Sequence, residues 1–190
     1  MSAIDTTFHW DKNPTAINGL ATTYVSKRGN DTTGDGTAQN PYASIAKATS
    51  VATAGTNIML DDAIWSEQRT LNNRAFKWWG NGRTEINSDT VNLSMSGNEE
   101  FYFLHIKLST IIIPPEKYFK LFYSIIENVS AFYSGAGAIF FAKNSIILNC
   151  NMSGYYGSAN CQLENSLVIG GNTAFSTKDS TKFYIKNCIF

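Results

Sequence analysis

Side chains able to act as general acids or bases form no recognisable catalytic set in this chain of 190 residues. There are two histidines, His9 near the amino terminus and His105 between apolar residues of a strand-like segment. Asp61–Asp62 is expected to form a turn, and Glu99–Glu100, which follows Gly97-Asn98, is expected to lie in a loop. Glycoside hydrolysis requires two suitably placed carboxyl groups. Because no such pair is visible, the sequence favours a protein without catalytic activity.

The cysteines and the glycine-rich segment do not indicate a cofactor or a metal site. Cys150, Cys161 and Cys188 are odd in number and lack Cys-x-x-Cys spacing, so we expect buried free thiols. Segment 29–37 contains glycine and aspartate but lacks the ligand spacing of an EF-hand and the Gly-Lys-Ser/Thr of a P-loop. We therefore expect a solvated turn there, and neither a metal nor a cofactor in the protein.

Aromatic residues are abundant, with 12 Phe, 9 Tyr and 4 Trp, and some of them are candidates for stacking on sugar rings. Trp65, Trp78 and Trp79 lie among many apolar residues, so we expect them to pack inside the protein. Tyr155 and Tyr156 lie between Ser-Gly and Gly-Ser, which places them in an exposed connection. These two tyrosines are the predicted binding residues.

The charge and the apolar segments of the chain indicate neither nucleic acid nor a membrane as a partner. The chain has 15 basic and 15 acidic residues and no run of lysine or arginine, so we expect no binding to nucleic acid. We expect no membrane insertion, because no apolar segment is long enough to span a bilayer. The amino terminus lacks the basic start and apolar core of a secretory signal, so we expect either that a signal lies outside this sequence or that the protein is made and used without export by that route.

From Phe119 onward the sequence repeats at a fixed interval of about 21 residues, a length typical of stacked repeats. One column of the repeat holds Ser124, Ser145, Ser166 and Asn187, and the two that follow are apolar, with Ile125, Ile146, Leu167 and Cys188 and then Ile126, Ile147, Val168 and Ile189. In such proteins each unit buries its apolar residues against its neighbours.

The composition of the repeat favours parallel strands. It is rich in Ile, Val, Phe and Tyr, and its apolar pairs do not alternate with polar residues, as is usual for strands covered on both faces. A coil of this length suffices for two or three short strands with turns between them. Asn128, Asn149 and Gly170 follow the apolar pairs and suit left-handed corners, where stacked asparagines can hydrogen-bond along the axis. We predict an all-β, right-handed parallel β-helix with coils of about 21 residues.

A short helix is expected to cover the first coil. Residues 45–54 place apolar side chains on one face at helical spacing, Ser44 can cap the start, and Gly55 can end the helix. The predicted organisation is therefore a tail or anchoring segment over 1–23, a strand, loop and capping helix over 24–56, and the β-helix over 57–190.

Several short motifs resemble the first coils of the pectate-lyase-like β-helix superfamily, and of phage tailspike and tail-fibre proteins within it. They are Tyr24-Val-Ser26, Gly34-Asp-Gly-Thr37, Asn40-Pro-Tyr-Ala-Ser-Ile45 and Trp79-Gly-Asn-Gly-Arg-Thr-Glu-Ile86. The resemblance covers most of the chain and implies the right-handed parallel β-helix and the direction of the chain through it. It does not specify an activity, because the superfamily includes lyases, hydrolases, epimerases, tailspikes and adhesins.

The catalytic groups that this resemblance would imply are not recognisable. Enzymes of the superfamily use an arginine base with a carboxylate cluster that binds calcium, or two or three aspartates on neighbouring strands. Arg69, Arg74 and Arg83 are close in sequence, but no carboxylate cluster can be assigned to them.

We therefore expect a phage virion appendage, of tail-fibre or tailspike type, that binds a host surface glycan or serves as a stalk. The resemblance implies a homotrimer, and the N-terminal segment is expected to contact other virion proteins. Because the chain stops at Phe190 inside an apolar repeat segment, we expect further coils or a partner subunit at this end. The alternatives are a polysaccharide lyase or glycoside hydrolase, and an extracellular adhesin or glycan-binding module at the cell surface.

Overall fold

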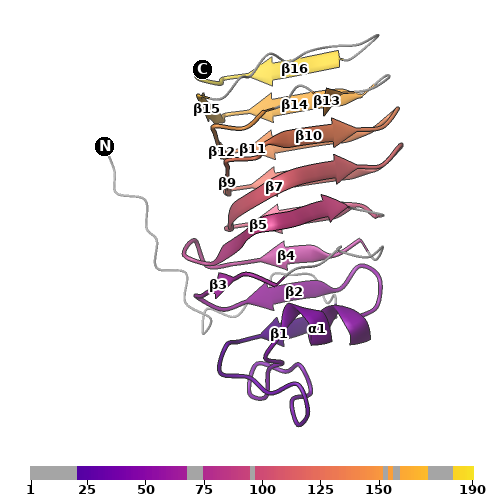
Figure 1. The fold of residues 1–190 in the computed structure, drawn as a ribbon, viewed down its shortest axis with the longest axis vertical. Helices are drawn as coiled ribbons and strands as arrows, with labels where there is room; N and C mark the ends of the chain where they lie inside the picture. Colours follow the sequence, from indigo (N-terminus) through magenta and orange to yellow (C-terminus); the bar gives the residue numbers. More distant parts are fainter. Residues whose placement is uncertain (1–20, 68–74, 95–96, 152–153, 156–158, 171–181) are drawn as a thin grey trace.

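The protein is a stack of parallel strands that runs along one axis, with a short helix at the N-terminal end of the stack (Figure 1). The computed structural model describes residues 21–67, 75–94, 97–151, 154–155, 159–170 and 182–190. The first sheet consists, in spatial order, of β1 (Thr22–Val25), β2 (Asn57–Leu60), β4 (Lys77–Trp79), β6 (Glu99–Tyr102), β8 (Tyr118–Phe122), β11 (Ile139–Lys143), β14 (Asn160–Glu164) and β16 (Lys182–Lys186). All of its pairings are parallel.

The second sheet branches. One branch holds β3 (Ile64–Trp65), β5 (Glu85–Ser94), β7 (His105–Ile113), β9 (Ile125–Glu127), β12 (Ile146–Leu148) and β15 (Leu167–Ile169), and the other adds β10 (Ala131–Ser134) and β13 (Gly154–Tyr155) to β7. The long strand β7 joins the branches, because its first half pairs with β9 and its second half with β10. Each coil thus contributes in turn to the first sheet and to the second, which confirms the predicted parallel β-helix.

The hydrogen bonds between coils give the coil length directly. Corresponding positions that are bonded to one another are 20 residues apart for Leu104 and Ser124, and 21 residues apart for Ser124 and Ser145. The interval from Ser145 to Ser166 is again 21 residues. The last described interval is longer, since Asn165 and Asn187 are 22 residues apart.

The longer last interval corrects one part of the predicted repeat. Asn187 was expected to continue the serine column, but Glu164 pairs with Lys186 and Leu167 with Ile189. Asn187 therefore follows Asn165, and Cys188 takes the position after Ser166. One additional residue before β16 shifts this coil out of the strict period. The hydrogen-bonded partners therefore differ from those that a constant count of 21 residues would give.

The interior is filled by side chains that alternate with outward ones along each strand. Phe101, Phe119 and Phe140 stack inside on successive coils, with ring centroids 4.8 and 5.9 Å apart. Cys150 and Cys161 are buried free thiols, as predicted, whereas Cys188 is partly exposed. Of the tryptophans expected to pack inside, Trp65 and Trp78 are buried and Trp79 is partly exposed.

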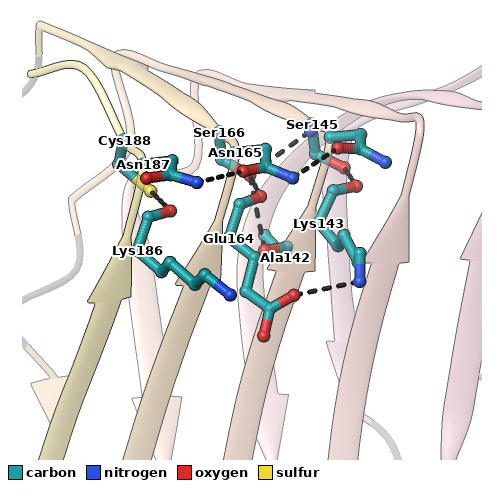
Figure 2. A network of polar contacts seen from close by, with 10 residues as sticks. Ala142, Lys143, Ser145, Glu164, Asn165, Ser166, Lys186, Asn187 and Cys188 are labelled. Carbon is teal, nitrogen blue, oxygen red and sulfur yellow. Dashed lines mark hydrogen bonds and ion pairs between the residues drawn. The ribbon is translucent and has the colours of Figure 1, made fainter.

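The serine column forms a hydrogen-bonded ladder within the corner between the sheets (Figure 2). Ser124, Ser145 and Ser166 are buried, and each hydroxyl donates to the carbonyl two residues earlier over 2.8–2.9 Å. The hydroxyls of Ser145 and Ser166 also accept the backbone N–H of the serine one coil earlier, over 3.3 Å. A small hydroxyl therefore satisfies buried backbone groups at a sharp bend, which explains why serine recurs there.

The helix α1 (Ile45–Val51) forms inside the predicted range and lies beside β1 and β2 in Figure 1. The hydroxyl of Ser44 accepts the N–H of Lys47, as expected for a cap. Glu67 accepts the next free N–H groups of the first turn, those of Ile45 and Ala46, over 2.9 and 3.0 Å. The glycine-rich loop also helps to fix the start of the helix, because the carboxylate of Asp31 accepts hydrogen bonds from the backbone N–H and the hydroxyl of Ser44.

The residues that follow β9, β12 and β15 form a second corner, which has the predicted left-handed backbone. Asn128, Asn149 and Gly170 have φ values of 59°, 49° and 64°, in the left-handed region. A Cβ atom on Gly170 would lie 2.3 Å from Oδ1 of Asn149, so this position requires glycine for space as well as for backbone freedom.

Glu99 lies in a strand, contrary to the prediction. It was expected in a loop, but it lies in β6 and is buried, with Oε2 accepting a 2.8 Å hydrogen bond from Nε1 of Trp78. Burial raises the pKa of Glu99 to about 8, against the lowering effect of the Trp78 and Phe76 hydrogen bonds. Because its surroundings are aromatic, the carboxyl group is held in its neutral form at neutral pH.

Replacing Glu99 with glutamine should therefore stabilise the protein at high pH. The folded state retains a proton that the unfolded chain loses near its ordinary pKa of 4.5, so the stability contributed by Glu99 is complete below that pH and is lost as the pH rises to about 8. We expect Glu99→Gln to gain about 1–3 kcal/mol at pH 8 relative to pH 5, or roughly 3–10 °C in Tm. Thermal melts at both pH values test this, with exposed Glu116→Gln as control; an equal effect at both pH values would contradict it.

Candidate functional site

The ridge between the two sheets carries an unusual set of side chains. We call this ridge the first corner, and it consists of the residue that directly follows each first-sheet strand from β6 onward. These residues are Phe103, Tyr123, Asn144, Asn165 and Asn187, with φ between 46° and 56°. Asparagine tolerates the left-handed backbone, whereas a bulky aromatic residue rarely adopts it.

The asparagines form a directed ladder along the axis (Figure 2). Nδ2 of Asn187 donates to Oδ1 of Asn165 over 3.2 Å, and Nδ2 of Asn165 donates to Oδ1 of Asn144 over 3.3 Å. These donor groups therefore point toward the N-terminal end of the stack. Within the part of the chain that the structure describes, Nδ2 of Asn144 donates no hydrogen bond, so the ladder ends in a free donor.

Tyr123 precedes this free donor on the neighbouring coil. Its ring stacks on Phe103 with centroids 5.2 Å apart and planes at 9°, yet the residue remains 55% exposed. Holding two aromatic residues in a left-handed backbone costs on the order of 1–3 kcal/mol each. Such strain is concentrated at functional sites, and here it places a ring face at the surface beside a row of amides.

The outward aromatic residues of the first sheet differ from Tyr123 in what they expose. Trp79 stacks on Tyr102 with centroids 4.0 Å apart, and Tyr102 stacks on Phe122 at 4.7 Å. Each ring in this column covers the face of the next, so the column presents mainly ring edges to solvent. Tyr123 is covered on one side by Phe103, and its other side is followed by the much smaller Asn144.

Most charges beside the first corner are paired, whereas Lys186, next to Asn187 at its C-terminal end, makes no ion pair among the described residues. Lys143 Nζ lies 3.0 Å from Oε2 of Glu164 on the next coil, directly below the asparagine ladder in Figure 2. Further along the sheet, Glu100 lies 3.6 Å from both Lys77 and Lys120. The first corner therefore offers an apolar ring and amide groups without a strong net field.

A second group of chemically active side chains lies on the outward face of the second sheet. We call it the charged tetrad, and it consists of Glu85, His105, Lys107 and Glu127. His105 lies 3.5 Å from Glu85 through Nδ1 and 3.1 Å from Glu127 through Nε2. Lys107 lies 3.4 and 3.0 Å from the same two carboxylates. The group thus bridges three successive coils.

The pKa shifts in the tetrad do not favour proton transfer at neutral pH. Burial raises the pKa of Glu127, but the hydrogen bonds and charges of Lys107 and His105 outweigh it, so the net shift is downward. The hydrogen bond to Glu127 raises the pKa of Lys107. Acid–base catalysis needs shifts in the opposite directions, toward neutrality. The tetrad therefore acts as an electrostatic clamp between coils.

Sequence reasoning missed the tetrad because it assumed a constant period. His105, predicted in a strand-like segment, contacts carboxylates of both neighbouring coils. Glu85 pairs with His105 and His105 with Ile125, and both intervals are one residue shorter than the period of the later repeats. The charged positions therefore do not align with the repeat. A search that allowed the period to vary by one residue in either direction would have found them.

The other predicted site residues are placed as follows. Asp61–Asp62 forms the expected turn, with Asp61 accepting from Ser26 Oγ over 2.6 Å and Asp62 lying 3.8 Å from Arg83. The backbone of Tyr155 lies in β13, beside Ser134 of β10. Tyr156, Arg69, Arg74 and His9 lie outside the described residues, so the two binding tyrosines remain a prediction.

Among the described residues, no group of three or more His, Cys, Asp or Glu side chains is arranged to hold a metal ion. No described helix is long and apolar enough to cross a membrane.

Comparison with known proteins adds little to this description. No family profile matches the chain, and no curated protein sequence matches it. One solved structure, described as a rhamnogalacturonan lyase, aligns over 80% of this chain and 69% of its own, with 12% sequence identity and a TM-score of 0.35. This distant likeness carries no information on activity. The structure itself defines the class of the protein as a parallel β-helix.

Neutralising one carboxylate of the tetrad should weaken the stack in a pH-dependent way. Because the pKa of Glu127 is lowered on folding, its contribution is present above the ordinary pKa of a glutamate and is lost as the pH falls through the folded value. We expect Glu127→Gln to lower the stability by about 1 kcal/mol at pH 7, with the difference vanishing in acid and shrinking in high salt. Chemical denaturation from pH 7 downward measures it; an unchanged difference in acid would count against the clamp. Glu116→Gln serves again as the exposed control.

Proposed function

We propose that this chain is the β-helix of a phage virion appendage, of tail-fibre or tailspike type, whose first corner binds a glycan of the host cell surface. The observation that supports the binding role is the half-exposed ring of Tyr123 beside the asparagine ladder. A rigid parallel stack is a suitable scaffold, because it holds successive binding groups at a constant spacing of about 4.8 Å.

The chemistry of the first corner corresponds to that of a sugar. A sugar ring has an apolar C–H face, which packs against an aromatic ring, and a rim of hydroxyl groups, which both donate and accept hydrogen bonds. Tyr123 supplies the ring, and the amides of Asn144 and Asn165 supply donors and acceptors. Neither surface requires a charged ligand.

The proposed setting adds three expectations. The protein acts in the virion, as a homotrimer, with residues 1–23 in contact with other virion proteins. An extracellular adhesin would use the same binding surface at a cell surface. The mass of the native protein in solution separates these settings, since a trimer favours the appendage.

A polysaccharide lyase or glycoside hydrolase is the second candidate, and the charged tetrad is the observation that favours it. The tetrad is the one place in the described chain where a histidine lies between two carboxylates. The downward pKa shift of Glu127 weakens it as a base at neutral pH, so we rank this function below binding. Loss of polysaccharide cleavage in His105→Ala would reverse the order.

Replacing Tyr123 with asparagine should remove glycan binding while preserving the fold. Asparagine is the residue that the following coils use at this position, so it suits the left-handed backbone and relieves strain as the stack on Phe103 is lost. We expect Tm to change by no more than about 3 °C, and binding on an array of bacterial surface glycans to fall at least about tenfold.

The matched control is Tyr184→Asn, which removes another exposed tyrosine from the outward face of β16. It should bind like the wild type. Equal binding by wild type and Tyr123→Asn, or equal loss in both variants, would refute the assignment of binding to the first corner.

A further inference from the structure

The first corner contains a step between Tyr123 and Asn144. The ring of Phe103 covers the face of Tyr123 that looks toward the N-terminal end of the stack. On the other side, Asn144 lies one coil further on, and its side chain is shorter than that of tyrosine. Tyr123 remains 55% exposed although Phe103 stacks on its ring, as expected if the ring face toward the shorter Asn144 is open to solvent.

Because the hydrogen bonds of the ladder all run in one direction, the ladder presents an amide N–H donor at this step. Each amide nitrogen donates toward the N-terminal end, from Asn187 to Asn165 and from Asn165 to Asn144 (Figure 2). Amides linked in this way polarise one another, which strengthens the terminal donor. Nδ2 of Asn144 is that terminal donor, and it makes no hydrogen bond within the described residues. It lies on the coil next to Tyr123.

Charge limits the ligand that this step accepts. The residues of the first corner carry no charge, and Lys143 is already paired with Glu164 at 3.0 Å. At the step between Tyr123 and Asn144 an anionic sugar would find no unpaired cation and would repel Glu164, because Lys186, which makes no ion pair among the described residues, lies two coils beyond Asn144. An uncharged sugar requires no such partner, because its hydroxyl oxygen can accept directly from an amide N–H.

We propose that this step is a subsite for one uncharged pyranose unit of a glycan. Its C–H face lies on the open face of Tyr123, and one hydroxyl oxygen accepts from Nδ2 of Asn144. The ladder through Asn165 and Asn187 holds the amide of Asn144 in place, and further units of the glycan lie along it, parallel to the axis. This inference rests on the proposed glycan-binding function and specifies its ligand as neutral.

The substitution Asn144→Asp tests the role of the donor. Aspartate also tolerates the left-handed backbone, and its carboxylate still accepts the hydrogen bond from Asn165, but it has no N–H to donate. The matched control is Asn128→Asp, which makes the same change at an exposed left-handed position of the second corner. Both variants should melt within a few degrees of each other.

Binding is measured on an array that carries neutral hexose and deoxyhexose oligosaccharides beside uronate-containing ones, followed by calorimetry with the strongest neutral oligosaccharide. We expect neutral glycans to bind, Asn144→Asp to weaken them at least about tenfold, and Asn128→Asp to have no effect. In NMR spectra, the side-chain amide signals of Asn144 should shift on addition of that oligosaccharide, and those of Asn128 should not.

The outcomes separate the two proposals. If Tyr123→Asn abolishes binding but Asn144→Asp does not, or if only uronate-containing glycans bind, the subsite is wrong and glycan binding at the first corner stands. If wild type and Tyr123→Asn behave alike, or if the wild type binds none of the glycans, both proposals fail.

Discussion

The stacking of each coil on the next through continuous parallel ladders is the constraint on which the rest of the structure depends. A strand residue is paired with the residue at the same position on a neighbouring coil, so a side chain is favoured where it suits the column in which it lies. The phenylalanines inside the first sheet and the serines in the corner are such columns. Glu99 is the exception, since it inserts a carboxyl group among aromatic rings and remains neutral there.

The same constraint acts on the surface, where it produces two different kinds of column. In the charged tetrad, opposite charges alternate between coils and satisfy one another, which ties β5, β7 and β9 together. In the first corner, the amides satisfy one another but leave one donor free at the end of their row, among the residues that the structure describes. A column whose polar groups all pair with one another stabilises the fold, whereas a column that ends in an unbonded donor can bind a ligand.

Backbone geometry explains why the open end lies where it does. The first corner requires a left-handed residue on each coil, and asparagine meets that need at low cost. Phe103 and Tyr123 meet it at higher cost, and their rings interrupt the row of amides. This change of residue type along one column brings an aromatic face next to an amide donor. The strain at these two positions is offset by the ladders on both sides of the corner.

The sequence by itself determined the class of the fold, the capping helix and the left-handed second corner, because these depend on local composition and on a period that recurs in the chain. Only the tertiary structure decided which side chains meet. Coil lengths vary: the interval from Trp78 to its partner Phe101 is three residues longer than the next, from Phe101 to Leu121. A shift of a single residue turns a side chain to the opposite face of a strand. The charged tetrad, the buried Glu99 and the place of Asn187 all follow from this variation. They were therefore decided by the hydrogen-bonded register between coils, which no count along the sequence supplies.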